Sequence, residues 1–253
     1  MRRACVFGRA AALVIIPDTI IYDPPALAVF LTANRVTRQL YTPSLLEAVL
    51  DWSGESAERR AQLVEAFKSM RTLVLCGEVV TLELRSRTLE LAPHVTLLNL
   101  YSVSECHDVS MAELSRADFK TPSSRYCPTG QLLPGVEVLI MAEGSGEEGP
   151  QHLKAVPLGM PGEIYVAGPT LGRGYLKRPD LNATRFPPRP ASLPPLPKLL
   201  LPGQDASEPA IYNRICTRRM HPPAREASRS LHQREPPTPL TRTRMGTRAW
   251  ASL

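Results

Sequence analysis

Residues 99–105 read Asn-Leu-Tyr-Ser-Val-Ser-Glu and bring an aromatic ring, two hydroxyls and a carboxylate together within seven positions. The pattern predicts a strand at residues 95–100, so these groups would lie at the carboxyl edge of a sheet. Open α/β folds bind their ligands at that edge. The sequence therefore indicates a ligand site here. The alternative is a strand end followed by a polar turn that binds nothing.

Cys106, His107 and Asp108 follow directly and are the residue types of a nucleophile, a base and an orienting acid. Three consecutive side chains cannot converge into such a relay, because its members come from separate segments of the chain. We therefore expect no catalytic triad here. Asp108 could instead pair with a substrate amine or cap a helix beginning near Ser110, and the sequence leaves both roles open.

A second informative stretch covers residues 161–186, PGEIYVAGPTLGRGYLKRPDLNATRF. After a Pro-Gly turn, residues 163–167 are rich in β-branched and aromatic types and predict a strand. Gly172 and Gly174 flank an arginine and allow the backbone to adopt positive φ and pass close to another segment. Pro179 can open a helix, with Asp180 placed at the positive end of the helix dipole.

Alternating strands and helices are expected to position these stretches. Apolar runs predict strands, including a buried parallel strand at the first of them; they cover residues 10–16, 36–41, 73–76 and 95–100. Asp23-Pro24 and Thr42-Pro43 predict two helix starts, and two more helices are expected at residues 55–70 and 79–92. This order indicates an α/β layer with a mostly parallel sheet.

The domain organisation changes twice along the chain. Residues 1–125 are expected to form the α/β part, and residues 126–186 a small β-rich subdomain with a hairpin loop at 142–152. Residues 187–253 hold 13 of the 26 prolines and ten arginines without apolar periodicity. Such a stretch cannot bury enough apolar surface to fold, so we expect a disordered tail. It is either a basic recognition tail or sequence that was never selected in this protein, through intron read-through or a frameshift.

The net charge of +6 belongs to this tail, since residues 187–253 alone carry +7 and the remaining 186 residues carry −1. The folded part thus has no charge support for nucleic-acid binding. The five cysteines form no C-x-x-C pair, which disfavours a disulfide framework or a zinc site. No apolar run reaches transmembrane length. A cytoplasmic protein with no nucleic-acid or membrane partner is expected.

Residues 161–186 closely resemble the GE-(L/I)-x-(V/I)-x-G…GYL-x-(R/N)-P-(E/D)…(R/K)F segment of adenylate-forming enzymes, the family of acyl-CoA synthetases, luciferases and the adenylation domains of nonribosomal peptide synthetases. Residues 99–105 look like the N-x-Y-G-x-T-E segment of the same family, with Ser102 and Ser104 in place of glycine and threonine. The resemblance covers residues 10–186. It implies part of the large domain of such an enzyme, most similar to an amino-acid adenylation domain.

The resemblance also implies site residues. Tyr101 would stack on adenine, the Ser104 hydroxyl would contact phosphate and Glu105 would hold Mg²⁺, an ion that prefers carboxylate and phosphate oxygens. Gly77 and Glu78 match the family's G-G-E turn beside the nucleotide. The substrate pocket would be lined by six residues: Leu40, Val74, Cys76, Leu100, Asp108 and Val109.

The implied reaction is attack of a small carboxylic or amino acid on ATP, with Mg²⁺, followed by transfer of the acyl group to a thiol of CoA or of phosphopantetheine on a carrier domain. The sequence contains neither the family's phosphate loop ending in Lys-Gly nor its Thr-Gly-Asp or lysine-bearing C-terminal domain. We therefore expect an enzyme fragment that is inactive alone and assign no catalytic residue. The alternative is a noncatalytic remnant that binds a partner.

Overall fold

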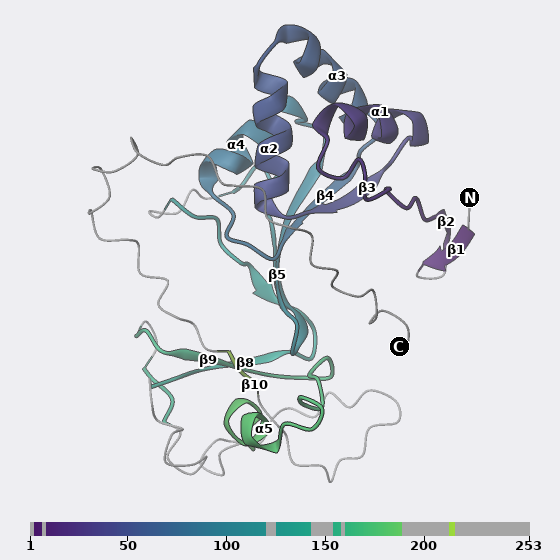
Figure 1. Cartoon of the computed structure of the whole chain (residues 1–253). Coiled ribbons are helices and arrows are strands. Elements are labelled where there is room, and N and C mark those ends of the chain that lie inside the picture. The colour runs from purple at the N-terminus through teal and green to yellow at the C-terminus, as the bar shows by residue number, and fades with distance from the viewer. Residues whose placement is uncertain are drawn as a thin grey trace, which may run out of the picture. The chain divides into compact units, whose positions relative to one another are not determined.

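The computed structural model describes residues 3–6, 9–119, 125–142, 154–157, 160–188 and 213–215 (Figure 1). All of them belong to the first of two units into which the chain divides at Cys216. The expected loop at 142–152 lies outside the described residues except for Ala142. The expected disordered tail also lies outside them, apart from residues 187–188 and the strand β10 (Asn213–Ile215), where the structure differs from the expectation.

A five-stranded mixed sheet organises the first part of the chain, in the order β3-β4-β5-β6-β7. Its strands are β3 (Arg38–Tyr41), β4 (Thr72–Cys76), β5 (Thr96–Val103), β6 (His107–Glu113) and β7 (Gln131–Leu132). β3, β4 and β5 run parallel, whereas β6 and β7 are antiparallel additions. The predicted α/β class is confirmed, with a sheet that is parallel only in its first three strands.

Four helices lie beside this sheet, as Figure 1 shows: α1 (Pro24–Asn34), α2 (Pro43–Gly54), α3 (Ala57–Phe67) and α4 (Leu82–Leu91). Each begins at a side chain that accepts a hydrogen bond from the first turn; the caps are Asp23, Thr42, Ser56 and Thr81. These bonds satisfy amides that have no partner inside the helix. The predicted starts at Asp23-Pro24 and Thr42-Pro43 are confirmed.

All four helices share one core with one face of the sheet. The crossovers β3–α2–α3–β4 and β4–α4–β5 both connect to the next strand on the same side in the sheet. Because such crossovers are right-handed, both place their helices on the same face of the sheet. That face buries alternate strand residues; they are Tyr41, Leu73, Leu75 and Leu97. The alternate residues on the opposite face are partly exposed, from Leu40 on β3 to Met111 on β6, and none of α1–α4 covers them.

The predicted buried parallel strand at residues 10–16 is wrong. The structure instead has an antiparallel hairpin of β1 (Arg3–Val6) and β2 (Arg9–Ala12), and residues 13–17 are not in a strand. Leu13 is 55% exposed and Ile15 is 72% exposed. Local pairing closes a very short loop and costs little chain entropy, whereas joining the main sheet would fix a long connection.

A second, three-stranded sheet has the order β10-β9-β8 and is antiparallel throughout. β8 (Glu137–Met141) and β9 (Glu163–Ala167) match the predicted strands, and the short helix α5 (Pro179–Arg185) begins at the predicted proline. Met141, Tyr165 and Ala167 form a small core of their own. The division into residues 1–125 and 126–186 stays a proposal.

Candidate functional site

The β5–β6 hairpin carries the first predicted cluster. β5 continues to Val103, so Tyr101 lies inside the strand, paired with Ser110, instead of just after it. The chain then turns through residues 104–106, closed by the Cys106 amide donating to the Val103 carbonyl at 3.2 Å. Ser104 is exposed and Glu105 is half-buried on this turn.

The Tyr101 ring packs on a small apolar cluster whose buried members are Cys106, Val109 and Val166. Burial raises the pKa of the Tyr101 phenol, with a smaller contribution from the nearby Cys106. The phenol therefore stays neutral at physiological pH. Tyr101 itself is only half-buried, so the cluster fixes its position and leaves part of it accessible.

The two informative stretches of the sequence meet at Glu105. The Tyr175 hydroxyl donates to Glu105 Oε1 at 2.5 Å, across 70 residues of chain. The Gly172 amide donates to the Glu105 carbonyl at 2.7 Å, and the Thr170 hydroxyl donates to the Cys106 carbonyl at 2.8 Å. Three hydrogen bonds thus hold the hairpin turn against residues 170–175.

Tyr175 is itself held in place. The Asn182 side chain accepts from the Tyr175 amide at 2.7 Å and donates to its carbonyl at 2.9 Å. Gly174 has φ of 124°, and a Cβ there would lie 2.9 Å from the Asn182 oxygen, so only glycine fits. The Tyr175 ring meets Phe186 edge to face at 5.4 Å.

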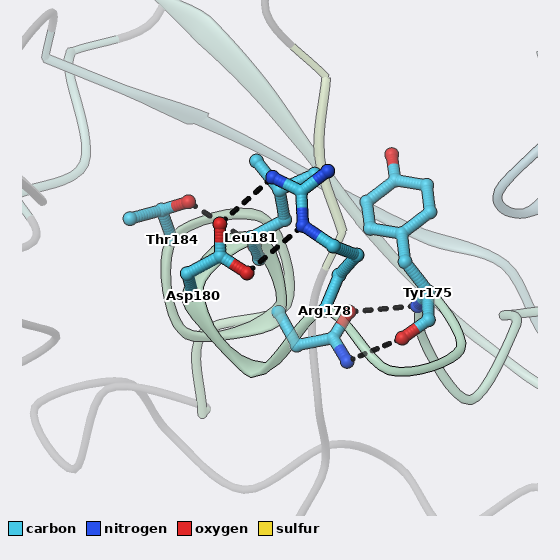
Figure 2. Close-up of polar contacts among 6 residues, drawn as sticks. Tyr175, Arg178, Asp180, Leu181 and Thr184 are labelled. Atoms are coloured by element: carbon cyan, nitrogen blue, oxygen red, sulfur yellow. Dashed lines mark hydrogen bonds and ion pairs between the residues drawn. The ribbon is translucent and has the colours of Figure 1, made fainter.

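Helix α5 begins beside this tyrosine, and Figure 2 shows Tyr175 near the Arg178–Asp180 pair of the first turn. The Arg178 guanidinium donates two hydrogen bonds to the Asp180 carboxylate at 3.0 and 2.8 Å. The pair keeps the pKa of Asp180 below its usual range, chiefly through the hydrogen bond from Arg178. Both side chains are exposed, so we assign the pair a structural role at the helix start.

The turn after β4 places Gly77 and Glu78. Gly77 has φ of 89°, which glycine adopts without strain. The Glu78 carboxylate accepts from the Ser44 amide and from the Ser44 hydroxyl, both at 2.9 Å, at the start of α2. A carboxylate is favourable at a helix N-terminus, so Glu78 has a structural partner whether or not a ligand binds.

Four of the six predicted pocket residues form a diagonal row on the face of the sheet opposite α1–α4. Leu40 pairs in register with Val74, and Cys76 pairs with Leu100. Val74 and Cys76 are two residues apart on β4 and share this face. Cys76 Sγ also lies 3.1 Å from the Ser102 hydroxyl, which links the ends of β4 and β5. Val109 is buried on the hairpin and does not line this row.

The predicted helix near Ser110 is wrong, because residues 107–113 form strand β6. From Ser110 to Glu113 buried and exposed residues alternate, which fits a strand against β5. Asp108 therefore caps no helix, and its carboxylate lies 3.1 Å from His107 Nδ1. Cys106 is buried, and burial raises its thiol pKa to about 11, helped by Glu105. A neutral, enclosed thiol agrees with the rejection of a triad.

Sequence reasoning gave no role to Tyr175, Thr170 or Ser44, which the structure brings to the predicted residues. No cluster of three metal-binding side chains occurs in the described part of the chain. Mg²⁺ often takes only one or two protein carboxylates and completes its shell with phosphates and water. Glu105 fits that use, since among the described residues only Tyr175 bonds its carboxylate, through Oε1.

Comparison with known proteins identifies the class. Residues 3–176 match the AMP-binding enzyme family, so the chain belongs to the AMP-binding, adenylate-forming enzymes. It is 36% identical over 187 residues to glycine betaine reductase ATRR of Emericella nidulans. It is 31% identical over 168 residues to tyrocidine synthase 3 of Brevibacillus parabrevis. It thus represents part of an adenylation domain of the kind found in nonribosomal peptide synthetases.

The chain spans only a part of these relatives. The alignment with glycine betaine reductase covers 74% of the chain and 13% of that protein. With tyrocidine synthase 3 it covers 66% of the chain and 2% of the synthase. Among solved structures, the nonribosomal peptide synthetase FmoA3 (S1046A) shares the fold with a TM-score of 0.55 and 22% identity, over 76% of the chain and 17% of FmoA3. No helix of the described residues is long and apolar enough to cross a bilayer.

Proposed function

We propose that the chain supplies the nucleotide-holding part of an enzyme that activates a small carboxylic or amino acid with ATP. The carboxylate oxygen attacks the α-phosphorus, the bond to the β-phosphate oxygen breaks, and acyl-AMP and pyrophosphate form. A thiol, of CoA or of phosphopantetheine on a carrier domain, then attacks the acyl carbon and AMP leaves. The observation that carries the proposal is the junction at Glu105, where both family-like segments meet.

Each residue has a separate task in this proposal. Tyr101 offers its ring to the adenine, and the exposed Ser104 hydroxyl contacts a phosphate oxygen. Glu105 holds Mg²⁺, which when bound neutralises charge on the phosphate oxygens. The turn at Gly77 and Glu78 lies beside the nucleotide. The row from Leu40 to Leu100 lines the substrate side.

The acid and the acceptor are proposed from the relatives. Glycine betaine reductase is named for a small carboxylate with a quaternary ammonium group, and tyrocidine synthase 3 for a peptide product. One structural neighbour is an artificial fusion of an adenylation domain with a carrier protein, NpsA-ThdA of Klebsiella oxytoca, with a TM-score of 0.54. We therefore propose a small acid and a carrier domain as partners.

The test compares three variants in a longer form that carries the phosphate loop and the C-terminal domain. Glu105→Gln keeps the side-chain shape but removes the charge, so carboxylate-dependent exchange of pyrophosphate into ATP should fall about a hundredfold. Tyr101→Ala should mainly raise the KM for ATP, because stacking on one base contributes roughly 1–3 kcal/mol. Ser104→Ala should have a smaller effect on the same KM.

Melting measurements on the same variants provide the control. Glu105→Gln should leave the melting temperature nearly unchanged, because an amide oxygen still accepts from Tyr175. If the Glu105→Gln and Tyr101→Ala variants lose activity only in proportion to lost stability, the assignment of the hairpin to nucleotide binding fails. We expect the 253-residue chain alone to show no measurable exchange, and robust exchange would refute the proposal that it needs further segments.

A further inference from the structure

A cavity of about 430 Å³ lies at the amino ends of β3, β4 and β5. Its charged lining consists of Arg35, Lys68, Arg71 and His94, and no acidic residue lines it. β5 alone has eight residues and spans roughly 26 Å, so this cavity and the Glu105 hairpin lie at opposite ends of the strands. Neither the fold class nor the proposed nucleotide site accounts for it.

The positive charge is local. Residues 1–186 carry a net charge of −1, yet three permanent cations converge here. Lys68 forms an exposed pair with Glu65 at 3.3 Å, and the carboxyl ends of α1 and α3 each bring about half a negative charge. A net positive charge of about one remains. Arg35 and Arg71 have no ion pair or side-chain hydrogen bond with any described residue.

Hydroxyl groups and a rigid frame complete the cavity. Thr37, Ser69 and Thr96 line it together with the cations. The Arg71 amide donates to the Thr37 carbonyl at 2.7 Å, and the Thr96 amide donates to the Arg71 carbonyl at 2.8 Å. These hydrogen bonds hold the amino ends of β3, β4 and β5 together. The His94 ring is fixed by Nε2 at 3.1 Å from the Phe67 carbonyl, which can only accept.

The backbone at Arg35 supplies independent support. Arg35 caps the end of α1 with φ of 49° and ψ of 50°, the left-handed region where glycine is the usual residue. A side chain with a Cβ is strained in this conformation. The chain has an arginine at this position. The backbone is strained there, and the arginine side chain lines the cavity.

We propose that this cavity binds a phosphate group, as free phosphate or as a phosphate monoester. Guanidinium groups match phosphate oxygens in a two-pronged geometry, and the Thr37 and Thr96 hydroxyls can donate to the same oxygens, whereas the Ser69 hydroxyl already donates to the Val36 carbonyl. The proposal does not depend on nucleotide binding at the hairpin. It assigns the basic end of the sheet a ligand of its own.

The test titrates the full chain with inorganic phosphate, and separately with methyl phosphate, at constant ionic strength, using chloride as the balancing anion. Amide chemical shifts of residues around the cavity should saturate with a Kd near the millimolar range. Arg71→Gln should weaken binding about tenfold, because a charge-assisted hydrogen bond is lost. Tighter binding of methyl phosphate identifies a monoester as the ligand, and equal binding identifies the free anion.

Two further variants test whether phosphate binding depends on the arginines of the cavity. Arg38→Gln removes the same charge from an exposed β3 position that does not line the cavity and should leave phosphate binding unchanged. Arg35→Gly should weaken binding while raising the melting temperature, because glycine relieves the strain. A purely structural arginine would show no binding effect. Absence of saturation up to about 10 mM, or equal weakening by Arg38→Gln and Arg71→Gln, would overturn the proposal.

Discussion

The Tyr175–Glu105 hydrogen bond joins two segments that are distant in sequence, so its removal should loosen the hairpin turn without disturbing the main core. Tyr175→Phe deletes the hydroxyl and keeps the ring against Phe186. A hydrogen bond to a charged group contributes about 1.5–3 kcal/mol when enclosed. Tyr175 is only half-buried and solvent weakens the interaction, so we expect about 0.5–1 kcal/mol.

The assay is reversible denaturation of the full chain in urea, with the melting temperature as a second readout. A loss of about 0.5–1 kcal/mol corresponds to a fall of a few degrees in a domain of this size. Asn182→Ala removes both bonds to the Tyr175 backbone and should cost more, about 1–2 kcal/mol. Tyr22→Phe is the matched control, because Tyr22 is 82% exposed and should show no change.

The pH dependence provides a sharper test. The hydrogen bond to Glu105 is the main reason that the pKa of Tyr175 is raised, followed by burial and by the Glu105 charge. A raised folded pKa means that the stabilisation is complete below the ordinary value near 10 and is lost as the pH rises through the folded value. The difference between wild type and Tyr175→Phe should therefore vanish at strongly alkaline pH. A difference that persists there, or equal effects of Tyr175→Phe and Tyr22→Phe, would refute this account.

Two other predictions concern buried groups. Tyr41→Phe should raise stability by about 1 kcal/mol in urea denaturation, because the Tyr41 hydroxyl is buried without a partner among the described residues. Burial raises the Tyr41 pKa, so the variant should also lose less stability above pH 10; a destabilised variant would contradict this. Peptide mapping after alkylation at pH 8 should find Cys106 labelled about a hundredfold more slowly than an ordinary exposed thiol, given its pKa of about 11. Labelling of folded Cys106 at the rate of denatured protein would show that it is accessible.

Local signals in the sequence predicted most single elements. Asp23 and Thr42 before proline marked two helix starts, because capping depends on a few neighbouring residues. The strand at 163–167 was predicted at its observed bounds. The buried strand predicted at 10–16 and the helix predicted near Ser110 were wrong, because in both cases the pairing partner decided the structure. Strand pairing depends on two segments, and the sequence of one segment does not identify its partner.

The candidate site divides in the same way. Glu105 and Tyr101 stood out by residue type and by their position after the strand that the sequence predicted at 95–100. The contact with Tyr175 could not be derived from spacing, because a hydrogen bond across 70 residues depends on the three-dimensional path of the chain. Gly174 was a partial signal, since a glycine pair marks close backbone approach without naming the segment approached. The Ser44 partner of Glu78 gave no sequence signal at all.

The face of the five-stranded sheet opposite α1–α4 affects how the protein behaves in solution. Leu40 is 56% exposed and Met111 is 40% exposed, with Val74, Leu98 and Leu100 between them in register. An apolar surface that crosses four strands favours association with other apolar surfaces in water. β3, which carries Leu40, is also an edge strand of this sheet, and edge strands can pair with another chain. This face therefore favours self-association of the protein. Charge repulsion between the basic tails of residues 187–253 opposes self-association, and it weakens as salt is added.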